Sequence, residues 1–481
     1  MRAAKKRQPR PAKALIFEPG LSEEHQEMVQ FASGLYERDG VVGVRRHRIV
    51  KVLQTALDAV DPAAALHDQL HRKGDFLFID DRRYDLASYA HVYVVGTGKA
   101  GAPMAQAIEE ILGDRVTSGY INVKYGHLLP THMIEINEAG HPIPDAAGIA
   151  GSQRIAEILN TAGENDLVFC LISGGGSALM TLPVKGISLA NVKALTSALL
   201  RAGATINEIN TIRKHLDRLK GGNLARLAYP AEVISLILSD VVGNPLDVIA
   251  SGPTVPDTST FADAYGLLER YDLLEKVPAP VAEYLLRGVQ GEIADTPKAG
   301  DPIFDHTQNV LVASNGIAAL AAERAAQDLG FHTLLLSTYV EGEAREVAKV
   351  YAALAKEVLA SGHPIPRPAC IIAGGETTVT IKGQGKGGRN QEMALMAAIC
   401  IQGLEDVDVV CLATDGTDGP TDASGAWADG TTLQRARTLG LDPWSHLENN
   451  DAYPFFAALD DLLLTGPTHT NVNDLTFVFV W

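Results

Sequence analysis

The chain has 481 residues, a length that exceeds one ordinary hydrophobic core and predicts two or three domains. Its 46% hydrophobic and 21% charged residues are typical of a globular protein, and no apolar run approaches the ~18 residues of a membrane span. The formal net charge of −17 repels nucleic acids and anionic lipid surfaces, so we expect neither of them as a partner.

The cysteines and the N-terminal segment bear on localisation. The cysteines are Cys170, Cys370, Cys400 and Cys411. They show no C-x-x-C spacing, which favours buried reduced thiols over zinc sites or disulfides, as in a cytoplasmic protein. Residues 1–13 are basic and lack the apolar stretch of a secretion signal. We interpret residues 1–41 as an N-terminal extension, with a transit peptide as the alternative for its basic start.

Helices and strands alternate along most of the chain. Apolar residues at helical spacing over 42–70 indicate two helices separated at Pro62. The short apolar runs predicted as strands are 91–96, 119–124, 166–173, 232–240, 309–314, 332–338, 369–375, 408–416 and 475–480. The amphipathic stretches predicted as helices include 99–112, 188–203 and 205–222, and three more separate the strands after residue 309.

This alternation predicts an α/β fold with mainly parallel sheets flanked by helices. Residues 273–305 are rich in proline and charge and show little periodicity, so we place a domain boundary there. The predicted domains are 42–272 and 306–481, each built on its own sheet.

Polar glycine loops follow most of the predicted strands. They are GTGKAG (96–101), SGGGSA (173–178), SDVVGNPLDVIASGPT (239–254), GGETT (374–378), GQGKGGRNQE (383–392) and ATDGTDGPTDASG (413–425). In open α/β sheets, ligands bind outside the carboxyl ends of the strands. We therefore expect these loops to form a small-molecule site.

The first loop matches G-x-G-x-x-G between a strand and a helix, as in dinucleotide-binding proteins. The next predicted strand ends without the carboxylate that would hold the ribose of a nicotinamide cofactor, which argues against that cofactor. Lys99 lies at the start of a predicted helix, where the helix dipole disfavours a cation, so we expect an anionic ligand beside it. The sequence contains no Walker A motif, and Ser177 lacks the G-x-S-x-G elbow of a serine hydrolase.

Two loops are predicted to cradle an anion through main-chain amides. The residues of the first are Ser173, Gly174, Gly175, Gly176 and Ser177. In the second, Gly387 and Gly388 free the main chain, and Arg389 supplies a planar fork for phosphate or carboxylate.

Acidic residues also lie at the ends of predicted strands. Asp240 directly follows one strand, and Glu376 and Asp415 lie on further loops. Such carboxylates hold Mg²⁺ together with phosphate oxygens, or accept a hydroxyl proton. For Asp418 and Asp422, turn capping is an equal alternative.

Ten motifs between residues 42 and 480 occur in an order that is typical of one protein family. They are VVGTGKAG, VKYGH, EAGHPIPD, LISGGGSALM, NTIRKHLDRLKGGNLA, LSDVVGNPLDVIASGPTVPD, GGETTVTI, GKGGRNQE, ATDGTDGPTDASGA and TGPTHTNVND. In this order they resemble the glycerate 2-kinase family with a MOFRL-type C-terminal domain, also labelled hydroxypyruvate reductases. The resemblance implies ATP-dependent phosphorylation of D-glycerate at O2 with Mg²⁺. It also implies a Rossmann-like N-terminal domain and a site in the cleft between two α/β domains.

The resemblance assigns roles to individual residues. The family's catalytic lysine and arginine correspond to Lys99 and Arg389, which we expect to neutralise charge on the transferred phosphoryl group. The two glycine loops are expected to hold ATP, and Asp240 to position or deprotonate the C2 hydroxyl. The remaining expected contacts are Asp415 and Glu376 for Mg²⁺, and Arg213 or Lys220 for the glycerate carboxylate.

One departure from the family and two alternative functions accompany this hypothesis. His469 stands in TGPTHTN where the family usually has glycine, which would alter substrate preference if that turn lines the pocket. The alternatives are an NAD(P)H-dependent hydroxypyruvate reductase and a non-catalytic sugar-acid-binding protein. A homo-oligomer is left open.

Overall fold

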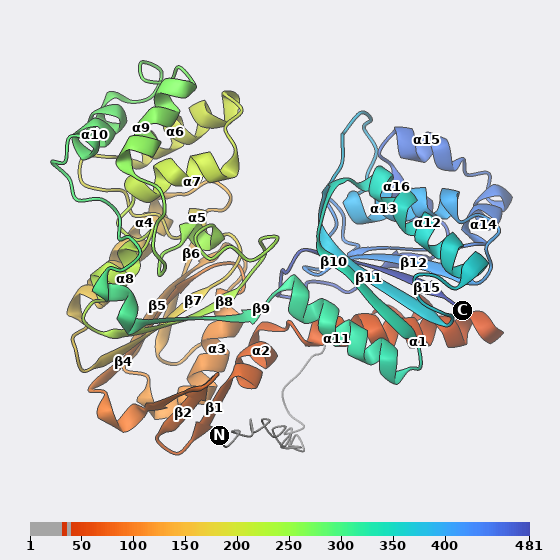
Figure 1. Cartoon of the computed structure of the whole chain (residues 1–481), viewed down its shortest axis with the longest axis horizontal. Coiled ribbons are helices and arrows are strands. Elements are labelled where there is room, and N and C mark those ends of the chain that lie inside the picture. The colour runs from red at the N-terminus through yellow and green to blue at the C-terminus, as the bar shows by residue number, and fades with distance from the viewer. Residues whose placement is uncertain (1–30, 36–39) are drawn as a thin grey trace, which may run out of the picture.

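The computed structural model describes residues 31–35 and 40–481, so most of the predicted extension 1–41 lies outside the described residues. Two six-stranded sheets form the centres of two bodies, and a small three-stranded sheet is attached to the first body (Figure 1). This α/β arrangement confirms the predicted fold class. No helix in the described part of the chain is both long and apolar enough to cross a bilayer.

The first sheet is parallel throughout and has the strand order β6-β5-β4-β7-β8-β9. Its strands are β4 (His91–Thr97), β5 (Ser118–Lys124), β6 (Ile134–Ala139), β7 (Asp166–Ile172), β8 (Glu232–Leu238) and β9 (Thr307–Ala313). The chain proceeds outward from β4 in one direction and from β7 in the other. The carboxyl ends of β4 and β7 therefore flank the topological switch point, where sheets of this kind bind ligands.

Helices cover both faces of the first sheet. They are α2 (Pro62–Gln69), α3 (Gly101–Leu112), α4 (Ala146–Thr161), α5 (Gly176–Leu179) and α8 (Asn223–Ala228). Strands β1 (Leu70–Lys73), β2 (Phe76–Ile79) and β3 (Arg82–Asp85) form the small antiparallel sheet. Pro62 begins α2 directly after its N-cap Asp61, as the helix break predicted there requires.

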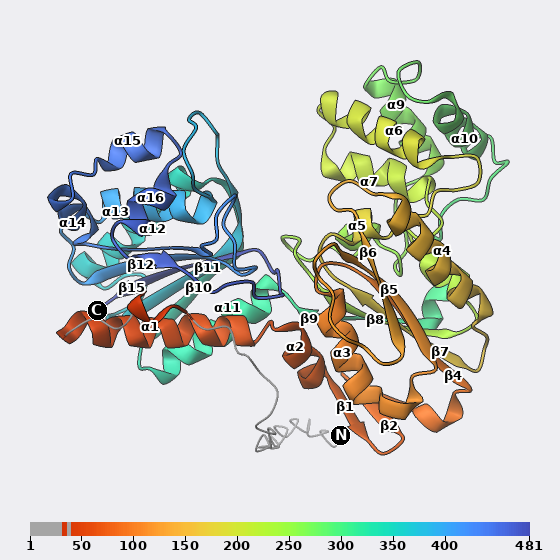
Figure 2. The same cartoon turned by 180° about the vertical axis from the view of Figure 1, so that it is seen from behind.

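A helical cap stands above the first sheet (Figures 1 and 2). It consists of α6 (Leu189–Arg201), α7 (Ile206–His215), α9 (Phe261–Arg270) and α10 (Ala279–Val289), which share an apolar core of their own. The single helix predicted over 205–222 is wrong, because α7 ends at His215. The Asp217 carboxylate then accepts hydrogen bonds from the amides of Leu182 and Leu219, which pulls the chain out of the helix.

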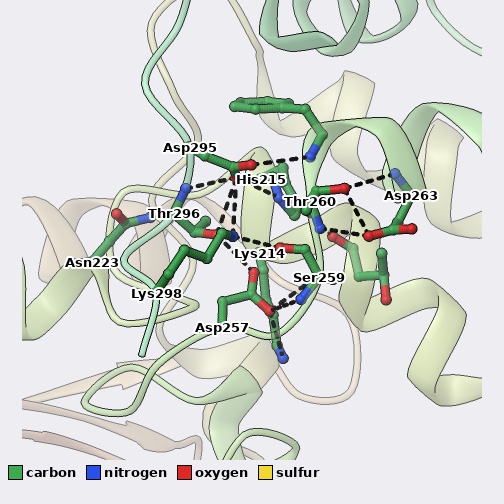
Figure 3. A network of polar contacts seen from close by, with 12 residues as sticks. Lys214, His215, Asn223, Asp257, Ser259, Thr260, Asp263, Asp295, Thr296 and Lys298 are labelled. Atoms are coloured by element: carbon green, nitrogen blue, oxygen red, sulfur yellow. Dashed lines mark hydrogen bonds and ion pairs between the residues drawn. The ribbon is translucent and has the colours of Figure 1, made fainter. Parts of the chain in front are cut away.

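A polar network binds α7 to the segments that connect the cap with the body (Figure 3). His215 of α7 contacts the Asp295 carboxylate at 2.9 Å. Lys214 lies 3.3 Å from the buried Asp257 carboxylate, which also accepts a hydrogen bond from the Thr296 hydroxyl at 2.9 Å. The segment around Asp295 and Thr296 is thereby bound to α7.

The second sheet is mixed, with the order β10-β11-β15-β12-β13-β14. Its strands are β10 (His332–Glu343), β11 (Ala369–Thr378), β12 (Val407–Ala413), β13 (Gly425–Asp429), β14 (Leu462–Leu463) and β15 (Asp474–Val480). β10 and β11 pair in parallel, whereas the other neighbours pair antiparallel. This differs from the mainly parallel prediction because β15 arrives from a loop without a crossover helix and inserts between β11 and β12.

Further helices cover the second sheet. They are α11 (Asn315–Asp328), α12 (Ala344–Ser361), α13 (Arg389–Cys400), α14 (Thr432–Thr438), α15 (Pro443–Glu448) and α16 (Ala452–Ala457). Cys370 and Cys411 in this body and Cys170 in the first are buried free thiols, while Cys400 is partly buried.

Helix α1 (Gly40–Asp58) packs on the second body, beside α11 (Figures 1 and 2). Its buried Arg46 donates to Asp461 at 2.8 Å, and its guanidinium lies 4.6 Å from the centre of the Trp427 ring. The chain then builds the whole first body, including β9, before it returns to the second. The division into domains at 42–272 and 306–481 stays a prediction.

The polar network leads to a prediction about acid stability. Burial raises the pKa of Asp257, but Lys214 and the hydrogen bonds from Ser259 outweigh it and hold that pKa below its ordinary value. Asp257 therefore contributes stability above its unfolded pKa, and this contribution is lost as the pH falls through the folded pKa. We expect Asp257→Asn to lower the free energy of unfolding by about 1–3 kcal/mol at pH 7.

Urea denaturation at pH 7 and in acid checks this expectation. The two unfolding curves should begin to converge as the pH falls below about 4 and should meet only below the lowered folded pKa, where the carboxyl is protonated in the folded state as well. Glu275→Gln, at an exposed acid, should leave the curve nearly unchanged at both pH values. An Asp257→Asn deficit that stays constant with pH would contradict the assignment.

Candidate active site

Two loops meet at the switch point of the first sheet. One follows β4 and contains Lys99, and the other is the glycine loop, residues 173–177, which follows β7. The Lys99 amide donates to the Gly174 carbonyl at 2.9 Å, and the Ala100 amide donates to the Ser173 hydroxyl at 3.1 Å. These bonds fix the start of α3 against the glycine loop, so the main chain holds Lys99 in place.

Two glycines in the loop let other groups approach the main chain closely. A Cβ on Gly174 would lie 2.1 Å from Asp240 Oδ2, and one on Gly175 would lie 2.9 Å from the His141 ring. Gly175 also has a positive φ of 85°, which disfavours side chains. Among the described residues, the amides of Gly174 and Gly175 have no hydrogen-bond acceptor. The loop thus combines close packing with main-chain donors that remain available to an anion.

Asp240 follows β8 and lies beside Lys99. Burial raises the pKa of Asp240, the Lys99 ammonium lowers it, and the carboxylates of Glu376 and Asp415 raise it again. Lys99 is half-buried, and no described residue forms a hydrogen bond or ion pair with its ammonium group. Lys99 therefore offers a positive charge to a site in which the carboxylates of Glu376 and Asp415 act on Asp240.

The second body contributes Arg389 and Glu376 to this site. Arg389 begins α13 and donates to Glu376 Oε1 at 2.8 Å. Its guanidinium also binds both oxygens of Asp474, the first residue of β15. Although burial opposes it, the pKa of Arg389 is raised by Asp474 and Glu376, so the group stays charged.

Asn473 joins the two bodies at the site. Its side-chain amide donates to the Asp240 carbonyl at 2.8 Å and to Glu376 Oε2 at 3.0 Å. It does so from a positive φ of 66°, which asparagine tolerates better than most residues. Contacts therefore run from the main chain of Asp240 through Asn473 to Glu376 and Arg389.

In the second loop predicted to bind an anion, a carboxylate of the protein itself already accepts hydrogen bonds from the main-chain amides. The Asp418 carboxylate accepts hydrogen bonds from the amides of Asn390 and Gln391 at 3.1 and 2.8 Å, at the N-terminus of α13. A Cβ on Gly388 would lie 2.3 Å from the Asp418 carboxyl carbon. Capping thus accounts for Asp418 and for the bare main chain at Gly388, and the ATP role of Gly387 and Gly388 stays a prediction.

The two predicted carboxylate ligands have different surroundings. Lys220 is buried, and its ammonium binds the Met180 carbonyl and the Asp217 carboxylate, both at 2.6 Å. Arg213 lines a cavity of about 380 Å³, and no described residue accepts a hydrogen bond from its guanidinium. Of the two cations, only Arg213 thus lacks a protein partner among the described residues.

Sequence reasoning missed Asn473 and Asp474 as site residues. The signal was present, because both are polar residues directly before the apolar run 475–480. The His141 ring also lies against Gly175. Burial, together with Lys99 and Lys124, lowers the pKa of His141 to about 4, so its ring is neutral at pH 7.

Comparison with known proteins covers nearly the whole chain. Residues 48–286 match a domain of unknown function (DUF4147), and residues 369–474 match the MOFRL family. A glycerate 2-kinase of Pyrococcus horikoshii is 44% identical over 90% of this chain and 96% of its own length. The crystal structure of a glycerate kinase from Thermotoga maritima superposes with a TM-score of 0.82 at 40% identity, over 90% of this chain and 99% of that one. An Agrobacterium vitis protein named as a provisional hydroxypyruvate reductase is 44% identical over 80% of this chain and 86% of its own length.

The capping role of Asp418 can be tested by stability alone. Asp418→Ala leaves two buried amides at the start of α13 without an acceptor, so we expect the free energy of unfolding to fall by about 1–2 kcal/mol. Asp422→Ala, at the exposed acid of the same loop, is the matched control and should change stability little. Equal losses in the two variants, measured by urea denaturation, would remove Asp418 from this role.

Proposed function

The chain belongs to the family of glycerate 2-kinases with a MOFRL domain, and we propose that it transfers the terminal phosphoryl group of ATP to the 2-hydroxyl of D-glycerate. The observation that carries this proposal is the junction at Asn473, which bonds to the main chain of Asp240 in the first body and to Glu376, the partner of Arg389, in the second. Phosphoryl transfer depends mainly on such positioning and charge stabilisation.

The charges suit the transferred group. Negative charge on the phosphoryl oxygens needs fixed positive groups that do not have to reorganise during the reaction. Lys99 supplies a free ammonium held by main-chain bonds, and Arg389 supplies a guanidinium fixed by Glu376 and Asp474. The amides of Gly174 and Gly175 hold the neighbouring phosphate oxygens.

Asp240 is the proton acceptor in this mechanism. A new bond forms between O2 of glycerate and the terminal phosphorus, while the bond from that phosphorus to the bridging oxygen breaks and ADP leaves. The proton of the 2-hydroxyl passes to the Asp240 carboxylate. Burial raises the pKa of Asp240, which makes it a better base than an exposed aspartate.

Glu376 and Asp415 are the residues that would hold Mg²⁺. Both carboxylates raise the pKa of Asp240, so they lie close enough to concentrate negative charge at the site. In the described part of the chain, no cluster of three or more His, Cys, Asp or Glu residues could hold an ion by itself. That fits magnesium in kinases, whose shell is completed by phosphate oxygens and water. Bound there, the ion would neutralise phosphate charge.

The second candidate is the hydroxypyruvate reductase, which the name of the Agrobacterium vitis relative favours. A nicotinamide cofactor would need an acid at the end of β5 to hold its ribose. β5 ends instead at Lys124, which Tyr125 and Gly126 follow. The cofactor's ribose would thus meet a lysine where it needs a carboxylate.

One assay separates the candidates. Purified protein is given D-glycerate with Mg²⁺ and ATP, or hydroxypyruvate with NADH, and ADP and NAD⁺ are followed. We expect ADP and 2-phosphoglycerate to form in the first mixture and NADH to persist in the second. NADH loss without ADP formation would reverse the ranking, and no reaction in either mixture would favour a sugar-acid-binding protein.

Lys99→Ala tests the charge that the mechanism needs most. We expect turnover to fall about a thousandfold, because one fixed cation at the transferred group is lost while the main-chain bonds of the loop remain. Circular dichroism and the melting temperature should stay at wild-type values. Lys193→Ala, at an exposed lysine of α6, is the control and should keep full activity. A loss below tenfold in Lys99→Ala would remove Lys99 from the catalytic residues.

A further inference from the structure

A cavity of about 380 Å³ lies between the glycine loop and the helical cap. Gly175 and Ser177 line it on the side of the sheet, and residues of α6 and α7 line it on the side of the cap. In both views of the fold, α7 stands over α5, the short helix that continues the glycine loop (Figures 1 and 2). The cavity is therefore a direct extension of the candidate active site.

The walls of the cavity are mainly apolar. Val192 and Leu195 of α6, Leu216 after α7, and Ile143 and Pro144 of the loop after β6 line it. Every carbon of glycerate carries an oxygen, so this acceptor has no apolar face to bury there. A flat aromatic base has two such faces, and ligand sites of this size are typically apolar with a few polar groups.

The polar floor of the cavity carries one surplus positive charge. Asp217 and Lys220 form a buried ion pair with each other, which leaves the guanidinium of Arg213 without a hydrogen-bond partner among the described residues. Burial lowers the pKa of Arg213, and the nearby Asp217 opposes that effect. Because a partly buried charge without a partner is costly, the position suits an anionic ligand that reaches the cavity.

We propose that this cavity receives the base and ribose of the nucleoside triphosphate, with Arg213 donating to the phosphate nearest the ribose. The inference rests on the proposed kinase function and names the nucleotide subsite within it. It assigns Arg213 to the nucleotide, whereas sequence reasoning had assigned that residue to the carboxylate of glycerate.

The glycine loop sets the direction of the phosphate chain. Gly175 lines the cavity, and the preceding Gly174 touches the Asp240 carboxylate. A nucleoside in the cavity thus sends its phosphates along two consecutive amides toward Lys99 and Asp240. The acceptor then approaches from the side of Glu376 and Arg389, which keeps the two substrates on opposite sides of the transferred group.

A bulky side chain in the cavity tests the assignment. Thr196 lines the cavity from α6, whereas Ala194 of the same helix is exposed and does not line it. Calorimetry with ADP, which needs no turnover, should give a Kd at least about tenfold weaker for Thr196→Trp and an unchanged Kd for Ala194→Trp. The KM for D-glycerate at saturating ATP should change less than about twofold in both variants.

Arg213→Met provides a second measurement that does not depend on filling the cavity. We expect it to weaken ADP binding about tenfold and adenosine binding much less, because the lost contact is to a phosphate. Arg201→Met, at the exposed end of α6, is the control.

Two outcomes would overturn the proposal while the kinase function stands. In the first, ADP binds Thr196→Trp and Arg213→Met as it binds the wild-type protein. In the second, the KM for D-glycerate rises while ADP binding is unchanged, which would place the acceptor in the cavity. A wild-type protein that forms no ADP from glycerate and ATP would instead refute the proposed function itself.

Discussion

One side-chain amide, that of Asn473, joins the two halves of the candidate active site. It bonds to the main chain after β8 in the first sheet and to the carboxylate of Glu376, a residue of β11, in the second. Asn473 can do so because β15, which begins at the next residue, is held between β11 and β12. The insertion of the last strand into the second sheet thus determines where the charges of the first body meet those of the second.

The electrostatics of the site follow from that junction. Burial and the carboxylates of Glu376 and Asp415 raise the pKa of Asp240, an effect that the Lys99 ammonium opposes. Arg389 is already paired with Glu376 and Asp474, whereas Lys99 has no partner in the described part of the chain. The site therefore holds one fixed and one available cation, as the transfer of an anionic group between two oxygens requires.

Features that depend on neighbouring residues in the sequence were predicted from the sequence. Strand ends followed by glycine loops indicated the site, the local charge pattern indicated Lys99 and Arg389, and the resemblance to a family assigned their catalytic roles. Prediction from the sequence failed where contacts between distant segments determine the structure. The helix predicted over 205–222 stops at His215 because Asp217 binds the Leu182 amide, and Asn473 acquires its role only once β15 is in place. Gly388 lacks a side chain because Asp418 needs the space, which no local pattern reveals.

The central claim is that groups from both bodies act on the same phosphoryl group. A crystal structure with a non-hydrolysable ATP analogue, Mg²⁺ and D-glycerate tests this claim most directly. We expect the terminal phosphate within hydrogen-bonding distance of both the Lys99 ammonium and the Arg389 guanidinium, with the 2-hydroxyl of glycerate against Asp240. A terminal phosphate bound only by residues of one body, with Lys99 or Arg389 facing away from it, would contradict the account.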